Sequence, residues 1–95
     1  MTTPAHYSIE RIAPTAASYF RRLSRKTQQR IKQAYQHLCD VSPFHHPNPT
    51  VITPLTGKRR GLWRYRLSDI RIIYSVDKEK RAITIVAIDS RGDVY

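Results

Sequence analysis

The sequence predicts an α+β fold in which a mainly antiparallel four-stranded sheet carries an N-terminal αα-hairpin on one face. Three observations support this prediction. Residues 62–74 alternate apolar and basic side chains on both sides of Ser68-Asp69, which is typical of a β-hairpin. Residues 14–41 contain two amphipathic stretches with helical spacing. The segment from Ala82 to Ile88 is nearly all apolar, as in a strand shielded by its neighbours.

The first half of the chain is expected to form one strand and two helices. The strand runs from Tyr7 to Ile12, and Pro14 suits the first turn of the helix that follows. Ser24 can cap a second helix almost immediately afterwards. The expected apolar face of that helix consists of Ile31, Ala34, Tyr35, Leu38 and Val41. Two helices joined so tightly form an αα-hairpin.

The second half is expected to contribute three more strands, and the hairpin at residues 62–74 is the most informative of them. A two-residue turn at Ser68-Asp69 would place Arg66 opposite Arg71. One face would then be apolar or aromatic, with Trp63, Tyr65, Leu67, Ile70, Ile72 and Tyr74. The other face would carry Arg64, Arg66 and Arg71.

Like charges placed opposite each other destabilise a sheet, so a chain that keeps Arg66 across from Arg71 is expected to use the pair to hold something negative. By the same argument, removing Arg71 should leave folding unharmed or slightly improved. A one-residue slip is disfavoured because it would expose the whole aromatic face. Two alternatives stay open from the residues alone. The first is that the arginines form an ordinary solvated face. The second is that the turn between the two hairpin strands is longer than two residues, because Ser-Asp is a weaker turn signal than Asn-Gly.

Length and cysteine content indicate one cytoplasmic domain that spans residues 1–95. The single cysteine, Cys39, excludes an internal disulfide and fits a reducing compartment, where a buried thiol is the expected role. The first residues lack the apolar core of a signal peptide, and no apolar run approaches the length of a membrane span. No association with a membrane is therefore expected.

The charge indicates a polyanionic or acidic partner. Seventeen Lys and Arg residues against seven Asp and Glu residues give a net charge of +10. Two groups of basic residues are candidates for contacts with RNA: Arg25 and Lys26 on the second helix, and Lys58, Arg59 and Arg60 in a glycine-bracketed turn. The alternative is a basic surface that serves solubility alone.

No metal or other cofactor is expected. His37, Cys39, His45 and His46 are close in sequence, but they match no established ligand spacing. The last two lie in the loop from Ser42 to Thr50, where three prolines forbid regular structure.

An arginine cluster favours phosphate chemistry. Guanidinium groups bind phosphate bidentately at any cellular pH, and they stabilise the charge that develops when a 2′-hydroxyl attacks the next phosphate of RNA. Such cleavage also profits from a base and an acid, and arginine is a poor base because it stays protonated. On this face the sequence offers Tyr95 and the arginines themselves, without a good histidine or glutamate.

Three segments resemble the RelE/ParE toxin superfamily of bacterial toxin–antitoxin systems, in particular its RelE-like branch. They are Leu55-Thr56-Gly57, the run from Gly61 to Tyr74, and the final Ser90-Arg91-Gly92-Asp93-Val94-Tyr95. The resemblance covers nearly the whole chain. It implies a toxin that cuts mRNA in the ribosomal A site without a metal, and an acidic antitoxin that holds the toxin inactive in a hetero-oligomer.

The resemblance also implies roles for five residues. Arg64 and Arg66 fill the places of two basic residues on the first hairpin strand, and Arg71 would clamp the scissile phosphate. Arg91 would assist the leaving group, and Tyr95 would stack on or orient a base.

Three departures from the family pattern concern proton transfer and the turn. Arg64 and Arg66 stand where some members have lysine, Ser90 stands where many have histidine, and Ser68 stands where glycine is usual. Two alternative functions therefore stay open. One is a ParE-like inhibitor that binds DNA gyrase without nuclease chemistry, and the other is an inactive relative that serves only as a basic partner for the antitoxin.

Overall fold

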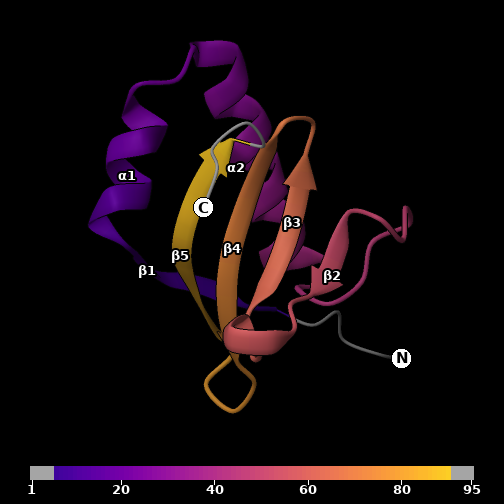
Figure 1. Ribbon diagram of the computed structural model, residues 1–95. Helices are drawn as coiled ribbons and strands as arrows, with labels where there is room; N and C mark the ends of the chain where they lie inside the picture. The colour runs from indigo at the N-terminus through magenta and orange to yellow at the C-terminus, as the bar shows by residue number, and fades with distance from the viewer. Residues whose placement is uncertain (1–5, 91–95) are drawn as a thin grey trace.

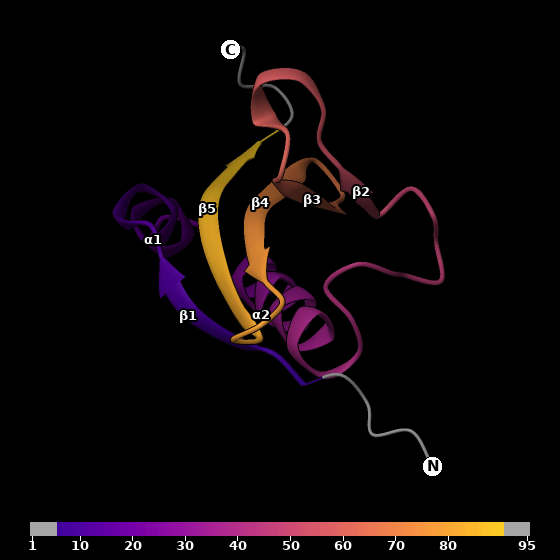
Figure 2. The ribbon, with the colours of Figure 1, turned by 90° about the horizontal axis from the view of Figure 1, so that it is seen from below.

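The fold has two layers, a sheet and a pair of helices that cover one of its faces (Figures 1 and 2). The computed structural model describes residues 6–90. The elements follow the order β1 (Ser8–Ile12), α1 (Pro14–Arg21), α2 (Arg25–Asp40), β2 (Ile52–Pro54), the 3₁₀ helix η1 (Gly57–Arg59), β3 (Trp63–Leu67), β4 (Ile70–Asp77) and β5 (Ala82–Ser90). This arrangement confirms the α+β class and the αα-hairpin packed on one face.

The sheet has five strands in the order β1-β5-β4-β3-β2, so the prediction of four strands is wrong. The missed strand, β2, has only three residues and ends in Pro54. It pairs antiparallel with β3 at the edge of the sheet, where a proline is tolerated. β1 pairs parallel with β5, and every other pair is antiparallel, which keeps the sheet mainly antiparallel as expected.

The two helices begin where the sequence predicts. Pro14 is the first residue of α1, and the backbone N–H of Thr27 donates to the side-chain oxygen of Ser24 at the start of α2. Ile31, Ala34 and Leu38 of α2 are buried against the sheet. Val41 is 58% exposed, which corrects its assignment to the apolar face. The helix has ended at Asp40, so helical spacing no longer directs Val41 to the core.

The register of the β3–β4 hairpin agrees with the sequence prediction at every pair. Leu67 pairs with Ile70 across the two-residue turn, and Arg66 pairs with Arg71. Ser68 adopts a φ of 58°, the left-handed region that usually favours glycine. The hairpin therefore directs its aromatic side chains to the helices and its arginines to the opposite face, which we call the open face of the sheet.

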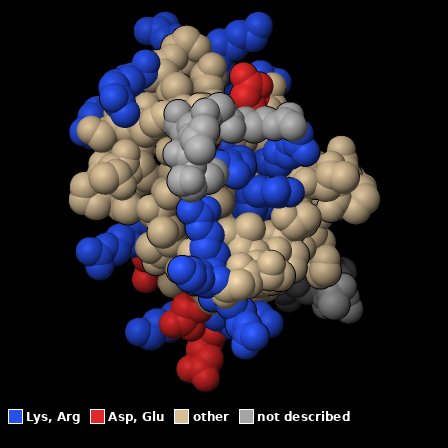
Figure 3. All heavy atoms as spheres, in the orientation of Figure 1, with Lys and Arg blue, Asp and Glu red and all other residues tan. Residues whose placement is uncertain are grey.

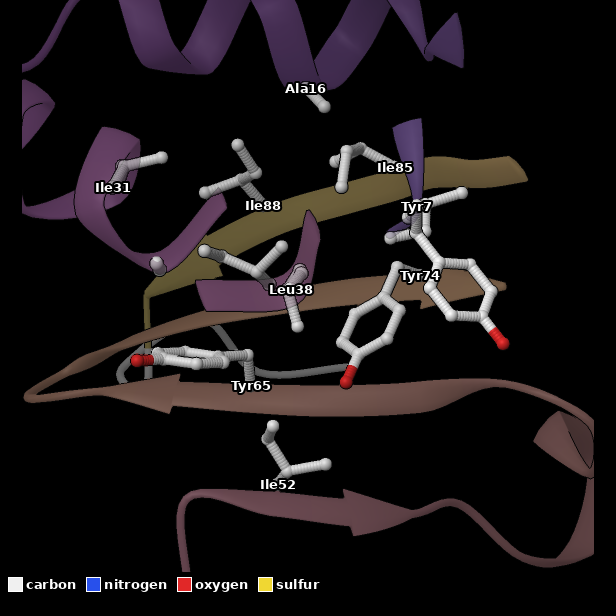
Figure 4. Close-up of a cluster of buried hydrophobic side chains, with 12 residues drawn as sticks. Tyr7, Ala16, Ile31, Leu38, Ile52, Tyr65, Tyr74, Ile85 and Ile88 are labelled. Atoms are coloured by element: carbon white, nitrogen blue, oxygen red, sulfur yellow. The ribbon is translucent and has the colours of Figure 1, made fainter. Parts of the chain in front are cut away.

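The core lies between the helices and the sheet (Figure 4). Tyr74 on β4 is fully buried there, and its hydroxyl donates to the backbone carbonyl oxygen of Pro43 at 2.6 Å. This bond ties the proline-rich loop to the central strand. None of the helices within residues 6–90 is long and apolar enough to cross a membrane.

Candidate phosphate-binding site

The three arginines of the hairpin line one hollow on the open face. Arg64 and Arg66 come from β3, and Arg71 comes from β4. With Ser68 they line a depression of about 190 Å³. In Figure 3 basic side chains gather over the middle of this face. The period-2 alternation of the strands is the direct cause, because it sends every second side chain to the same side of the sheet.

The three arginines of this hollow differ in how far their side chains are exposed to solvent. Arg66 is exposed, Arg64 is half-buried, and the side chain of Arg71 is 22% exposed. The Nε of Arg64 is buried and has no hydrogen-bond partner among residues 6–90. A buried donor of this kind loses free energy unless a ligand or water engages it. The hollow is thus rich in donors suited to an anion.

Asp89 is the acid beside this hollow, and sequence reasoning missed it. It lies on β5 directly opposite Arg71, and the Nε of Arg71 donates to its Oδ1 at 3.1 Å. The signal was present in the sequence, because Asp89 interrupts the apolar run of the last strand just before Ser90. The attraction between Arg71 and Asp89 offsets the repulsion between Arg66 and Arg71.

The other basic candidates lie at the two ends of the hairpin. Lys58, Arg59 and Arg60 are exposed in and after η1, near the start of β3. Arg25 and Lys26 are exposed in the first turn of α2, which lies at the end of the sheet that carries the β3–β4 turn (Figure 1). Neither group lines the arginine hollow. They stay candidates for contacts with a longer nucleic acid that passes along the hairpin.

Two residues implied by the family resemblance, Arg91 and Tyr95, lie outside the described residues. Their proposed roles therefore stay predictions. Ser90 is the last residue of β5 and pairs with Ile70, at the end of the hairpin that carries Arg66 and Arg71.

The histidines near the C-terminal end of α2 form an aromatic cluster against Tyr65. The rings of His37 and His46 are 4.8 Å apart, and both lie edge-on to the Tyr65 ring. Within residues 6–90 no group of three or more His, Cys, Asp or Glu side chains is placed to hold a metal ion. Cys39 is half-buried, and burial raises the pKa of its thiol. Burial likewise raises the pKa of Tyr65.

A second hollow, of about 290 Å³, lies in the helical layer. Ile12, Ala17, Phe20 and Tyr35 give it an apolar lining, and Arg21 and Lys32 contribute positive charge. Ile12 is 40% exposed here, and burial raises the pKa of Tyr35 to about 12. We call this second hollow the helical groove.

Comparisons with known proteins place the chain among toxins. Residues 10–95 match the family model for the ParE toxin of the type II toxin–antitoxin system parDE. No curated protein sequence matches the chain. The fold is similar to that of the RelBE2 toxin–antitoxin complex from Mycobacterium tuberculosis, with a TM-score of 0.73, 22% identity, and coverage of 97% of this chain and 98% of that chain.

Two further solved structures share the fold. The archaeal RelE–RelB complex from Pyrococcus horikoshii gives a TM-score of 0.72 at 24% identity, with 95% of this chain and 99% of that chain covered. The isolated RelE toxin of E. coli gives a TM-score of 0.66 at 16% identity, with 95% and 88% covered.

Proposed function

We propose that this chain, which belongs to the ParE toxin family and is the toxin of a type II toxin–antitoxin system, acts as an mRNA interferase. The proposed enzyme is a metal-independent endoribonuclease. It cuts mRNA on the ribosome and thereby blocks translation in the cytoplasm. The observation that supports this activity is the hollow lined by Arg64, Arg66 and Arg71. The solved relatives with the same fold include RelE toxins.

The hollow suits a phosphate diester. Arginines on two adjacent strands hold their guanidinium groups on rigid backbone, so donors are already in place when negative charge grows on the phosphate oxygens. In the proposed step the 2′-oxygen forms a bond to phosphorus and the bond to the 5′-oxygen breaks. The 2′-hydroxyl loses its proton to a base, and the leaving 5′-oxygen takes up a proton. Arg71 clamps the scissile phosphate, while Arg64 and Arg66 hold the charge beside it.

The positive charge of the chain favours an inhibitor protein of opposite charge. A net charge of +10 favours an acidic antitoxin, and two of the solved relatives are toxin–antitoxin complexes. An antitoxin segment that folds on binding could lie on or near the arginine face and wrap further around the toxin. The helical groove offers such a segment an apolar lining flanked by Arg21 and Lys32, which matches an amphipathic acidic helix.

Primer extension on a cellular mRNA after induction of the toxin tests the activity. Discrete cuts within codons, together with a fall in amino-acid incorporation, are expected. The same induction with the antitoxin co-expressed should leave the mRNA intact. Uncut mRNA in growth-arrested cells would contradict the nuclease proposal.

Inhibition of DNA gyrase by binding is the second candidate, and the match to the ParE family model favours it. Such an inhibitor needs no site for RNA cleavage. It would arrest growth with normal amino-acid incorporation and an induced DNA-damage response. Measuring both in the same culture separates the two functions.

A further inference from the structure

A smaller hollow of about 90 Å³ adjoins the arginine hollow at the β3–β4 turn, and we call it the turn hollow. It lies between the tip of the hairpin and the first half of α2. Ser68 lines both hollows, so they meet at that residue. The full lining of the turn hollow is Thr27, Arg30, Leu67, Ser68, Asp69 and Ile70.

The lining of the turn hollow combines a donor, an acceptor and an apolar surface. Arg30 is exposed on α2 and carries hydrogen-bond donors only, whereas the carboxylate of Asp69 is exposed in the turn and carries acceptors only. Within residues 6–90 these two side chains form no ion pair with each other. Leu67 and Ile70 are half-buried and pair across the turn, which supplies the apolar surface.

This lining suits a neutral, flat and polar-edged group better than a second phosphate. The carboxylate of Asp69 repels a phosphate, and Leu67 and Ile70 offer it no side-chain donor. A nucleobase is neutral, with apolar faces and an edge of donors and acceptors. Proteins that read single-stranded RNA stack such bases and form hydrogen bonds to these edges.

We infer that the turn hollow reads the base of a nucleotide beside the phosphate held in the arginine hollow, and that the preferred base is guanine. The identity of the ligand as RNA rests on the proposed function. Guanine presents O6 and N7 as adjacent acceptors for an arginine, and its N1–H and N2 amino group as adjacent donors for a carboxylate. Arg30 and Asp69 come from different elements, so they can approach these two edges of one base. Adenine lacks the paired donors.

The test measures binding without cleavage. Short uridine oligonucleotides carry a single internal guanine or adenine, and 2′-deoxy sugars throughout remove the attacking hydroxyl. Fluorescence anisotropy should show the guanine oligonucleotide binding at least about fivefold more tightly than the adenine one. Replacing guanine with hypoxanthine, which lacks the N2 amino group, should remove most of that advantage. Equal affinity for guanine and adenine in wild type would overturn the inference.

Two variants assign the preference to the turn hollow. In Asp69→Asn the amide no longer accepts two donors, so guanine and adenine should bind within about twofold of each other. Arg30→Gln should weaken the guanine oligonucleotide and leave an all-uridine one within about twofold of wild type. Glu79→Gln and Arg11→Gln are the matched charge controls, because Glu79 is exposed in the β4–β5 turn and Arg11 on the edge strand β1. Both should keep the guanine preference.

Two outcomes with the variants would overturn base recognition. If Arg30→Gln weakens every oligonucleotide equally, Arg30 contacts phosphate only. If Asp69→Asn keeps the full guanine preference while a thermal melt shows it folded, Asp69 does not read the base.

The failure of this inference is distinguishable from the failure of the nuclease proposal. If wild type cuts no mRNA but prefers guanine, and Asp69→Asn loses the preference, the nuclease proposal fails and the turn hollow stands as a base-binding site. If wild type cuts mRNA but binds guanine and adenine equally, the inference fails and the nuclease proposal stands.

Discussion

Tyr74→Phe removes one hydroxyl from the centre of the core. That hydroxyl donates to the carbonyl oxygen of Pro43 at 2.6 Å, and the ring is fully buried. Phenylalanine keeps the ring, so packing is preserved and the loss is confined to the hydrogen bond. Leaving a buried carbonyl without its donor costs about 1–3 kcal/mol. Urea unfolding at pH 7 should therefore show the variant less stable by about that amount.

The same variant has a distinct pH signature. Burial, and to a lesser extent Tyr65, raises the pKa of Tyr74 above its ordinary value of 10.0. A raised pKa in the folded state means that stability is complete below pH 10 and declines above it, because the unfolded tyrosine ionises first. Phenylalanine lacks this loss. The difference in unfolding free energy between wild type and Tyr74→Phe should thus narrow above pH 10 by about 1.4 kcal/mol per pH unit.

Tyr19→Phe is the control, because Tyr19 is a half-buried residue of α1 and its substitution should cost less than about 0.5 kcal/mol. Equal stability of Tyr74→Phe and wild type at pH 7 would refute the hydrogen-bond argument. A stability difference that stays constant from pH 10 to pH 11 would refute the linkage argument.

Three further predictions concern the hairpin. Ser68→Gly should stabilise the protein by about 1 kcal/mol in a urea titration, because glycine adopts the φ of 58° without strain; no gain would show that the turn is unstrained. Trp63→Ala should lose about 3 kcal/mol in a thermal melt through lost packing against Phe44, whose ring centroid lies 5.1 Å away, and a melt like that of wild type would contradict this. RNA affinity should fall as salt rises, and a plot of log affinity against log salt concentration should have a slope of about −2 if the three arginines each engage one phosphate. Arg66→Ala should make this slope shallower by about 0.7. An affinity that does not change with salt would remove the electrostatic explanation.

The sequence predicts the hairpin and its arginine face in detail because strict alternation leaves only one register that buries the aromatic side chains. It does not reveal β2, since a three-residue strand that ends in Pro54 lacks a pattern of its own. The sequence also does not predict the parallel pairing of β1 with β5, because this pairing depends on how the two helices return the chain to the sheet.

The largest gap in the sequence analysis of the site is Asp89. Sequence reasoning treats Arg66 and Arg71 as an uncompensated pair and expects removal of Arg71 to leave folding unharmed or slightly improved. The register of β5 supplies a carboxylate at 3.1 Å from Arg71, so Arg71→Ala removes an attraction as well as a repulsion. Its net effect on stability should stay within about 1 kcal/mol.

The most direct test of the arginine hollow as a cleavage site is the rate at which Arg71→Ala cuts an mRNA on purified ribosomes. Removing one donor to the developing charge should lower the rate by about 10²–10³-fold while the protein stays folded. Arg22→Ala, an exposed arginine of the helical layer, should cut at the wild-type rate. If Arg71→Ala cuts as fast as wild type, the hollow is not the active site.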